Sequence, residues 1–149
     1  MPGIVVGVDG SAHAQRALEW AMREAAVRHA EVTVLTINPA EASPWTGHPL
    51  TMPREAEARQ EARQAVEAAV ARSAAAIGTQ PPVPVAVSVG TGFPAQSLID
   101  ASRDADLVVI GSRGAGGFEA LLLGSISSQV VHHAACPVVI VPSSDRKRR

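Results

Sequence analysis

The chain has 149 residues, the usual size of one domain with a sizeable core, and a formal net charge of −1. Its hydrophobic content of 46% is a globular value and excludes wholesale disorder. Aromatic residues make up only 3%, with no tyrosine, and the basic residues are scattered, which argues against a nucleic-acid-binding surface.

The single cysteine, Cys136, bears on the cellular compartment. It cannot form an internal disulfide, which favours a reducing environment. The N-terminus reaches Asp9 before a signal-peptide core could form. No apolar run approaches the roughly 18 residues that span a bilayer. We therefore expect a soluble cytoplasmic domain over residues 1–143. Residues 144–149 form a basic C-terminal tail, expected to be disordered and solvated in preference to binding a partner.

The first half of the chain predicts two strands separated by a helix. Residues 4–8 form a short apolar strand and residues 32–37 a second one. The helix between them places its small apolar residues on one face: Ala14, Ala17, Leu18, Ala21 and Ala25. Residues 38–53 are proline-rich and predict a loop whose length hints at function or mobility. Trp45 and His48 in this loop form either the edge of a lid or a tip packed on the protein itself.

Asp9 follows the first strand directly. An acidic residue at the carboxyl end of a strand suits a ribose hydroxyl or a metal-bound phosphate. It equally suits the cap of the helix that follows, and the residues alone leave both roles open.

The second half begins with a long helix, from about residue 54 to residue 77, that ends at Gly78. Its predicted buried stripe consists of Ala58, Ala62, Ala65, Val66, Ala69, Val70 and Ile77. Its charged residues Glu55, Arg59, Glu61 and Arg63 are expected to face water.

Residues 83–89 predict a third strand, whose alternation and Pro84 indicate the edge of a sheet. Pro94 then suits the first position of a helix with Ala95, Leu98, Ile99 and Ser102 facing inward. A helix over residues 125–133 and a strand over residues 137–141 end the pattern. Strands alternating with helices predict an α/β fold, a doubly wound five-stranded parallel sheet with helices on both faces. Such sheets bind ligands beyond the carboxyl ends of their strands.

The stretch over residues 106–128 carries the strongest functional signal. Residues 107–110 are apolar without alternation, typical of a strand buried on both faces. Gly111, Gly114, Gly116 and Gly117 follow, and the pair Gly124-Ser125 opens a helix. Glycine lets backbone N–H groups approach a ligand, and a helix N-terminus favours anions, so the pattern predicts a phosphate cradle in two halves. A tight loop kept only for its shape is the structural alternative.

This stretch resembles a known family. The spacing Gly111-x2-Gly114-x9-Gly124-Ser125 is similar to the G-x2-G-x9-G-[S/T] pattern of the universal stress protein family, in its ATP-binding, single-domain branch. The resemblance extends to VGVDGS near the start and GSISSQVVHHAACPVVIV near the end, and no internal repeat is seen. It implies a Rossmann-like sheet, related to the adenine nucleotide alpha hydrolases, with strand order 3-2-1-4-5. That order would make the first and fourth strands neighbours.

The resemblance also implies an ATP site, with Mg²⁺ or Mn²⁺ bridging the phosphates. Asp9, with Gly7 and Val8, would lie against the ribose and adenine, and Ile37 would offer backbone groups to the adenine ring. The phosphates would be bound by Gly111, Ser112, Arg113, Gly114, Ala115, Gly116, Gly117, Gly124, Ser125 and Ile126. Arg113 sits in the variable pair of the motif, which leaves its role open. The strand at residues 138–141 would pair across a homodimer.

Binding is expected in preference to catalysis, because the only lysine is Lys147, in the tail. Glu119 lies in the connecting segment and is expected to be exposed instead of acting as a base. We therefore expect an ATP-binding stress-response switch with slow or absent hydrolysis. The alternatives are a nucleotide-independent interaction protein of the same fold, or a slow ATPase or adenylate-processing enzyme.

Two further patterns carry less weight. His132, His133 and Cys136 have spacings compatible with a metal, but no fourth ligand is evident, and we expect them to pack structurally. The alanine richness and the excess of arginine over lysine suggest a GC-rich bacterial source.

Overall fold

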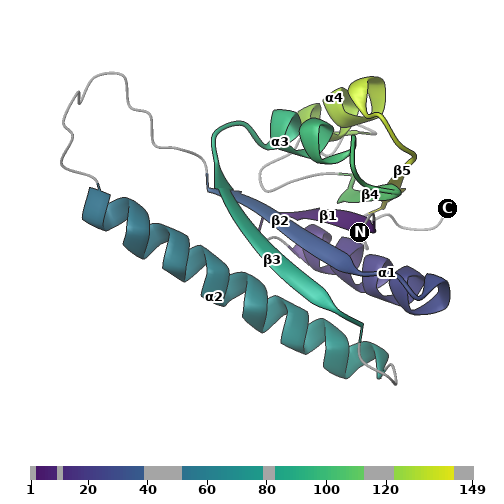
Figure 1. The fold of residues 1–149 in the computed structure, drawn as a ribbon, viewed down its shortest axis with the longest axis horizontal. Helices are drawn as coiled ribbons and strands as arrows, with labels where there is room; N and C mark the ends of the chain where they lie inside the picture. The colour runs from purple at the N-terminus through teal and green to yellow at the C-terminus, as the bar shows by residue number, and fades with distance from the viewer. Residues whose placement is uncertain (1–2, 10–11, 39–51, 79–82, 113–122, 143–149) are drawn as a thin grey trace, which may run out of the picture.

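The computed structural model describes residues 3–9, 12–38, 52–78, 83–112 and 123–142. Strands and helices alternate along the chain (Figure 1). In chain order they are β1 (Ile4–Val8), α1 (Ala12–Arg28), β2 (Val32–Asn38), α2 (Met52–Ile77), β3 (Val85–Thr91), α3 (Pro94–Ala101), β4 (Leu107–Gly111), α4 (Ser125–His133) and β5 (Val138–Val141).

The strands form one five-stranded parallel sheet in the order β3-β2-β1-β4-β5. This confirms the predicted order and the doubly wound α/β class. β1 lies at the centre, where Val6 pairs with Val34 of β2 and Val109 of β4. The carboxyl ends of β1 and β4 therefore lie side by side, as the resemblance implied.

Helices cover both faces of the sheet, α1 and α2 on one and α3 and α4 on the other (Figure 1). On the α1/α2 face, Leu18 and Met22 pack against Val6 and other buried strand residues, and these three side chains are at most 2% exposed. On the opposite face, Leu98 and Val130 pack against Val5, Val108 and Ile110. The central strands β1 and β4 are continuous apolar runs because they are buried on both sides.

The boundaries of the first strand and the last helix are as predicted, and others differ by one or two residues. The third strand spans residues 85–91 in place of 83–89. Pro84 has no N–H to donate, yet its carbonyl accepts a hydrogen bond from Val32 N at 2.9 Å, and regular pairing with β2 begins at Val85. Its predicted edge position is confirmed. α2 begins at Met52 because a proline is tolerated in the first turn, so the predicted loop over 38–53 is shorter at both ends.

The surface of α2 departs from the predicted stripe. Val66 is buried as expected, but Ala65 is exposed, and the fully buried residue is Ser73. Gln15 of α1 donates from Nε2 to Ser73 Oγ at 2.5 Å, so a polar contact joins the two helices. Arg63, expected to face water, is partly buried because its Nη1 donates to the carbonyl of Val87 on the β3 edge at 3.3 Å.

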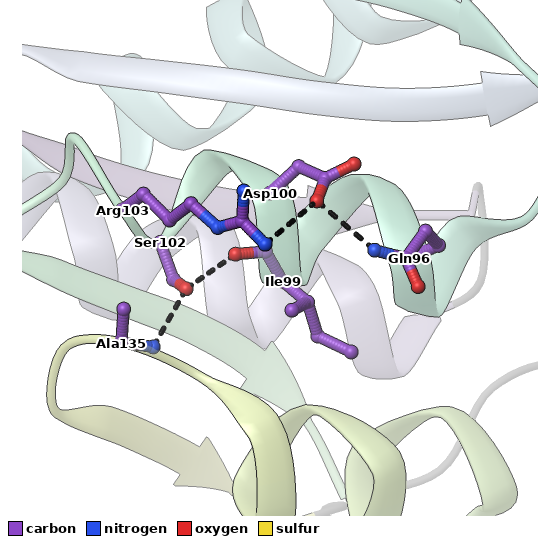
Figure 2. A network of polar contacts seen from close by, with 6 residues as sticks. All are labelled: Gln96, Ile99, Asp100, Ser102, Arg103 and Ala135. Atoms are coloured by element: carbon purple, nitrogen blue, oxygen red, sulfur yellow. Dashed lines mark hydrogen bonds and ion pairs between the residues drawn. The ribbon is translucent and has the colours of Figure 1, made fainter.

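Ser102, at the end of α3, is buried as predicted (1% exposed). Its hydroxyl donates to the Ile99 carbonyl at 2.5 Å and accepts from the Ala135 N–H at 2.8 Å (Figure 2). Ala135 lies in the connection between α4 and β5. The contact therefore fastens α3 to the chain that leads into the last strand.

Candidate functional site

A pocket opens at the carboxyl edge of the sheet, where β1, β2 and β4 end. Its lining comes from all three strands and from the first turns of α1, α3 and α4. The lining residues are Gly7, Val8, Asp9, Ala14, Leu35, Ile37, Pro94, Leu98, Ile110, Gly111, Ile126 and Ser127. The boundary between β1 and β4 is the topological switch point of the sheet, where the strand order reverses direction. Open α/β sheets bind ligands at this point.

Gly7 lies on the floor of the pocket, where its lack of a Cβ lets the side chains of Leu98 and Ile110 approach the backbone of β1 closely. A Cβ at Gly7 would lie 3.0 and 3.1 Å from the two Cδ atoms of Leu98 and 3.3 Å from Ile110 Cγ2. Those distances are tighter than ordinary packing, so an alanine there would displace the walls or fill the space. Glycine at this position therefore allows Leu98 and Ile110 to pack closely over β1 at the pocket floor.

The inner walls are apolar. Leu35 and Ile37 contribute from β2, Leu98 from α3 and Ile110 from β4. Strand register places Leu35 opposite Gly7, so both lie on the α3/α4 face of the sheet. A mostly apolar slot with few polar groups suits a planar, weakly polar group such as a nucleobase.

The outer rim includes the N-terminus of α4, through Ile126 and Ser127. The N-cap residue of this helix is Gly124, and among the described residues no side chain caps it. The first-turn N–H groups of a helix have no intrahelical partner and carry the positive end of the helix dipole. This end of the pocket therefore suits an anion such as a phosphate.

Two hydrogen bonds fix the start of α4 against the end of β4, and a third joins that end to β5. Ser127 Oγ donates to the Gly111 carbonyl at 2.8 Å, and Gly124 N donates to the Ser112 carbonyl at 2.8 Å. Ser112 N donates in turn to the Val141 carbonyl of β5 at 3.0 Å. Ser127 is buried, and its hydroxyl serves this contact. The anion-binding end of the pocket is thus held in place by backbone and hydroxyl groups.

Asp9 is exposed and is the acidic residue among those that line the pocket. It sits at the carboxyl end of β1, beside the first turn of α1. This position is compatible with both roles left open by the sequence, a contact to a sugar hydroxyl or bound cation and a contribution to the start of α1.

The structure brings part of the predicted site together. Gly7, Val8, Asp9, Ile37, Gly111 and Ile126 line the pocket. Ser112, Gly124 and Ser125 lie beside it along the chain without lining it. The remaining predicted site residues lie outside the described part of the chain: Arg113, Gly114, Ala115, Gly116 and Gly117. Trp45, His48 and Glu119, which carried other expectations, also lie outside it.

Sequence reasoning missed several lining residues. Ala14 and Leu98 were assigned to the core, and Leu35, Pro94, Ile110 and Ser127 received no site role. Apolar walls carry no local motif, because the same residue types fill cores. Ser127 alone offered a signal, since it lies three residues before the buried Val130 and so on the inward side of its helix.

The histidine–cysteine pattern does not form a metal centre in the part of the chain that the structure describes, where no group of three potential ligands is found. His132 and His133 are both exposed at the end of α4, so the packing expected of them is wrong. Cys136 is partly buried. Burial raises the pKa of its thiol above the ordinary 9.0, a hydrogen bond with the Val108 backbone opposes this, and the charge of Asp106 adds to it.

The parallel doubly wound sheet, with a pocket between the ends of β1 and β4, defines a Rossmann-like class of fold. The sequence model described as the universal stress protein family matches residues 2–142. The chain belongs to that family.

Relatives of known sequence and structure agree. The chain is 37% identical over 145 residues to a universal stress protein of Mycolicibacterium smegmatis, an alignment that covers 97% of this chain and 49% of that protein. It spans about half the length of the curated relatives it matches. Among the described residues, no helix has both the length and the apolarity to cross a membrane.

Two solved structures illustrate the shared fold. Universal stress protein UspA from Lactobacillus plantarum superimposes with a TM-score of 0.76 at 25% identity, covering 94% of this chain and 97% of that one. A universal stress protein in complex with cAMP superimposes with a TM-score of 0.64, also at 25% identity, covering 94% and 95%.

Proposed function

We propose that this protein binds ATP in the pocket between the ends of β1 and β4 and acts as a nucleotide-dependent switch in a stress response. The observation that carries the proposal is the pocket itself, with a glycine floor, apolar inner walls and an uncapped helix N-terminus at its outer rim. The cAMP complex of a relative supports an adenine nucleotide as the ligand class.

The two ends of the pocket match the two ends of such a nucleotide. The apolar slot between Ile37 and Leu98 suits the base, and Asp9 suits the ribose hydroxyls. The first turn of α4 suits the phosphates, whose charge Mg²⁺ or Mn²⁺ would share. In the sequence, the glycines over residues 111–117 complete the phosphate-binding pattern.

Binding with slow or absent hydrolysis is part of the proposal. Rapid phosphoryl transfer needs groups that position water and neutralise charge at the γ-phosphate. Among the described lining residues, Asp9 is the ionisable group, and neither lysine nor arginine lines the pocket. The proposal also includes a cytoplasmic location, in keeping with a single cysteine, and a homodimer formed through β5.

The test is calorimetric titration of the purified protein with ATP and Mg²⁺. We expect micromolar binding by the wild type and at least about tenfold weaker binding by Gly7→Ala, equivalent to about 1.4 kcal/mol, because its Cβ reaches Leu98. Gly114→Ala tests the motif in the same way.

Ser88→Ala is the matched control, since Ser88 is exposed on β3 and does not line the pocket. Absence of binding by folded wild-type protein would contradict the proposal. It would favour the alternative of an interaction protein that uses this fold without nucleotide.

A further inference from the structure

A contact between β2 and β3 controls one wall of the pocket. Gly90 of β3 pairs with Ile37 of β2 in the parallel register, so the two residues lie on the same face of the sheet. A Cβ built on Gly90 would lie 2.8 Å from Ile37 Cδ1. Ile37 lines the pocket, whereas Gly90 does not. The isoleucine side chain therefore extends into the space that a side chain at residue 90 would occupy.

The backbone does not explain the glycine. Gly90 is absent from the positive-φ residues of the described chain, which are His29, Gly78 and Gly92. Its φ is one that an alanine adopts without strain. The atom that a Cβ would meet is the far end of a flexible side chain, so the fold could adjust by moving Ile37 alone.

Moving Ile37 away from β3 relieves this contact, and the pocket lies on that side. A side chain at residue 90 blocks Ile37 on the β3 side. On its other side, β2 is paired with β1, and the last pair is Val8 with Thr36. Asp9, the next residue after β1, lines the pocket. Displacing Ile37 away from β3 therefore moves it over the end of β1, into the space between itself and Leu98.

We propose that Gly90 is a positioning residue that sets the width of the base-binding slot by letting Ile37 lean toward β3, and that this width selects a purine over a pyrimidine base. The inference rests on the proposed nucleotide binding and adds what determines its selectivity. Gly90 acts through Ile37 and does not itself touch the nucleotide.

The experiment compares ATP with CTP, which carry the same ribose and triphosphate. Calorimetric affinities are measured for wild type, Gly90→Ala, Ile37→Val and the double variant. In Gly90→Ala, ATP should bind about tenfold more weakly while CTP changes little, so the ATP/CTP affinity ratio falls. Ile37→Val removes Cδ1, and the double variant should recover the wild-type ratio. A merely structural glycine would not give this rescue.

Ser88→Ala, on the same face of β3 two residues earlier, is the matched control and should leave the ratio unchanged. Failure of wild type to bind either nucleotide defeats the proposed function. Normal ATP binding by wild type with an unchanged ratio in Gly90→Ala defeats only the role of Gly90, as does a reduced ratio that Ile37→Val does not restore. If Gly90→Ala does not fold, a folded double variant with the wild-type ratio supports the inference, and an unfolded one overturns it.

Discussion

Buried serine hydroxyl groups join separate helices and strands of this protein through hydrogen bonds. Ser73, Ser102 and Ser127 are all buried, and each joins two elements that are distant in sequence. A buried hydroxyl with satisfied partners contributes modestly, but removing it leaves its partner unpaired, which is the more costly event.

Ser102→Ala illustrates this cost. The substitution removes the hydrogen bond between the Ala135 N–H and the buried Ser102 hydroxyl. Because Ala135 itself is exposed and water can replace the lost partner, the free energy of unfolding should fall by about 0.5–1.5 kcal/mol. Urea denaturation followed by circular dichroism measures the change.

The control lies one residue away. Arg103 contacts Asp100 at 3.9 Å with both side chains well exposed (69% and 56%), and exposed pairs contribute about 0–1 kcal/mol (Figure 2). Arg103→Ala should therefore change stability by less than Ser102→Ala. A loss of stability in Ser102→Ala no larger than that in Arg103→Ala would contradict the argument.

These serines also mark the limit of sequence reasoning at the residue scale. The inward position of Ser102 was predicted from helical periodicity, and its partner was not. Ser73 was missed, because a serine among alanines looks like part of a polar face. Its partner Gln15 lies 58 residues earlier, and no local pattern records that contact.

At the scale of elements, the ends of α1 and α2 use the same backbone conformation with different residues. Gly78, after α2, has φ +59°, and its N–H donates to the Ala74 carbonyl at 3.0 Å. His29, after α1, has φ 55°, and the next residue, Ala30, donates to the Ala25 carbonyl at 2.9 Å. Left-handed termination of a helix is inexpensive for glycine and costs about 1–2 kcal/mol for other L-residues.

Exchanging the residue types should therefore shift stability in opposite directions. Gly78→Ala has space for its Cβ, so strain alone should lower the free energy of unfolding by about 1 kcal/mol. His29→Gly should raise it by a similar or smaller amount, since it relieves that strain. Thermal and urea denaturation of both variants measure the two signs. Two shifts of the same sign would contradict the argument.

The helix and strand pattern was predictable because each element has a local cause. Gly78 ends α2, and periodicity identified the buried face of α1. The strand predicted at residues 83–89 lies two residues too early, because the alternation of valines begins before Pro84. The regular pairing of β3 with β2 begins only at Val85. Ala65 was misplaced because an alanine-rich helix offers little contrast between its faces.

At the scale of the whole molecule, the adjacency of β1 and β4 was not derivable from local patterns. Strand order depends on which helices cross which face, and it entered through the family resemblance. Once it is known, Gly7 and Gly111 are brought to one pocket. The apolar walls remained unpredicted, because only the assembled sheet distinguishes a lining leucine from a core leucine.

The sheet has two edges, and the proposed homodimer uses β5. The carbonyls of Pro137 and Val141 face β4, where they accept from Val108 N and Ser112 N. Backbone groups of a strand alternate in direction, so the N–H of Ile140 faces outward. At the other edge, Arg63 already occupies the Val87 carbonyl of β3.

Sedimentation at several concentrations tests this arrangement. Wild type should sediment as a dimer. Ile140→Pro should sediment as a monomer, because proline removes an outward donor and is tolerated at a sheet edge. Circular dichroism checks that the variant is folded. Wild type that remains monomeric, or a proline variant that remains dimeric, would exclude β5 as the dimer edge.

The hydrogen bond between Gly124 N and the Ser112 carbonyl brings together the two ends of the segment between them. Ser112 directly follows β4, and Gly124 is the N-cap residue of α4, so the two ends are held by residues next to regular elements. The entropic cost of bringing the two ends of a segment together grows slowly with its length, by about 0.6 kcal/mol for each doubling. The hydrogen bond between Gly124 and Ser112 therefore fixes the distance that any sequence between them has to span, whatever its length.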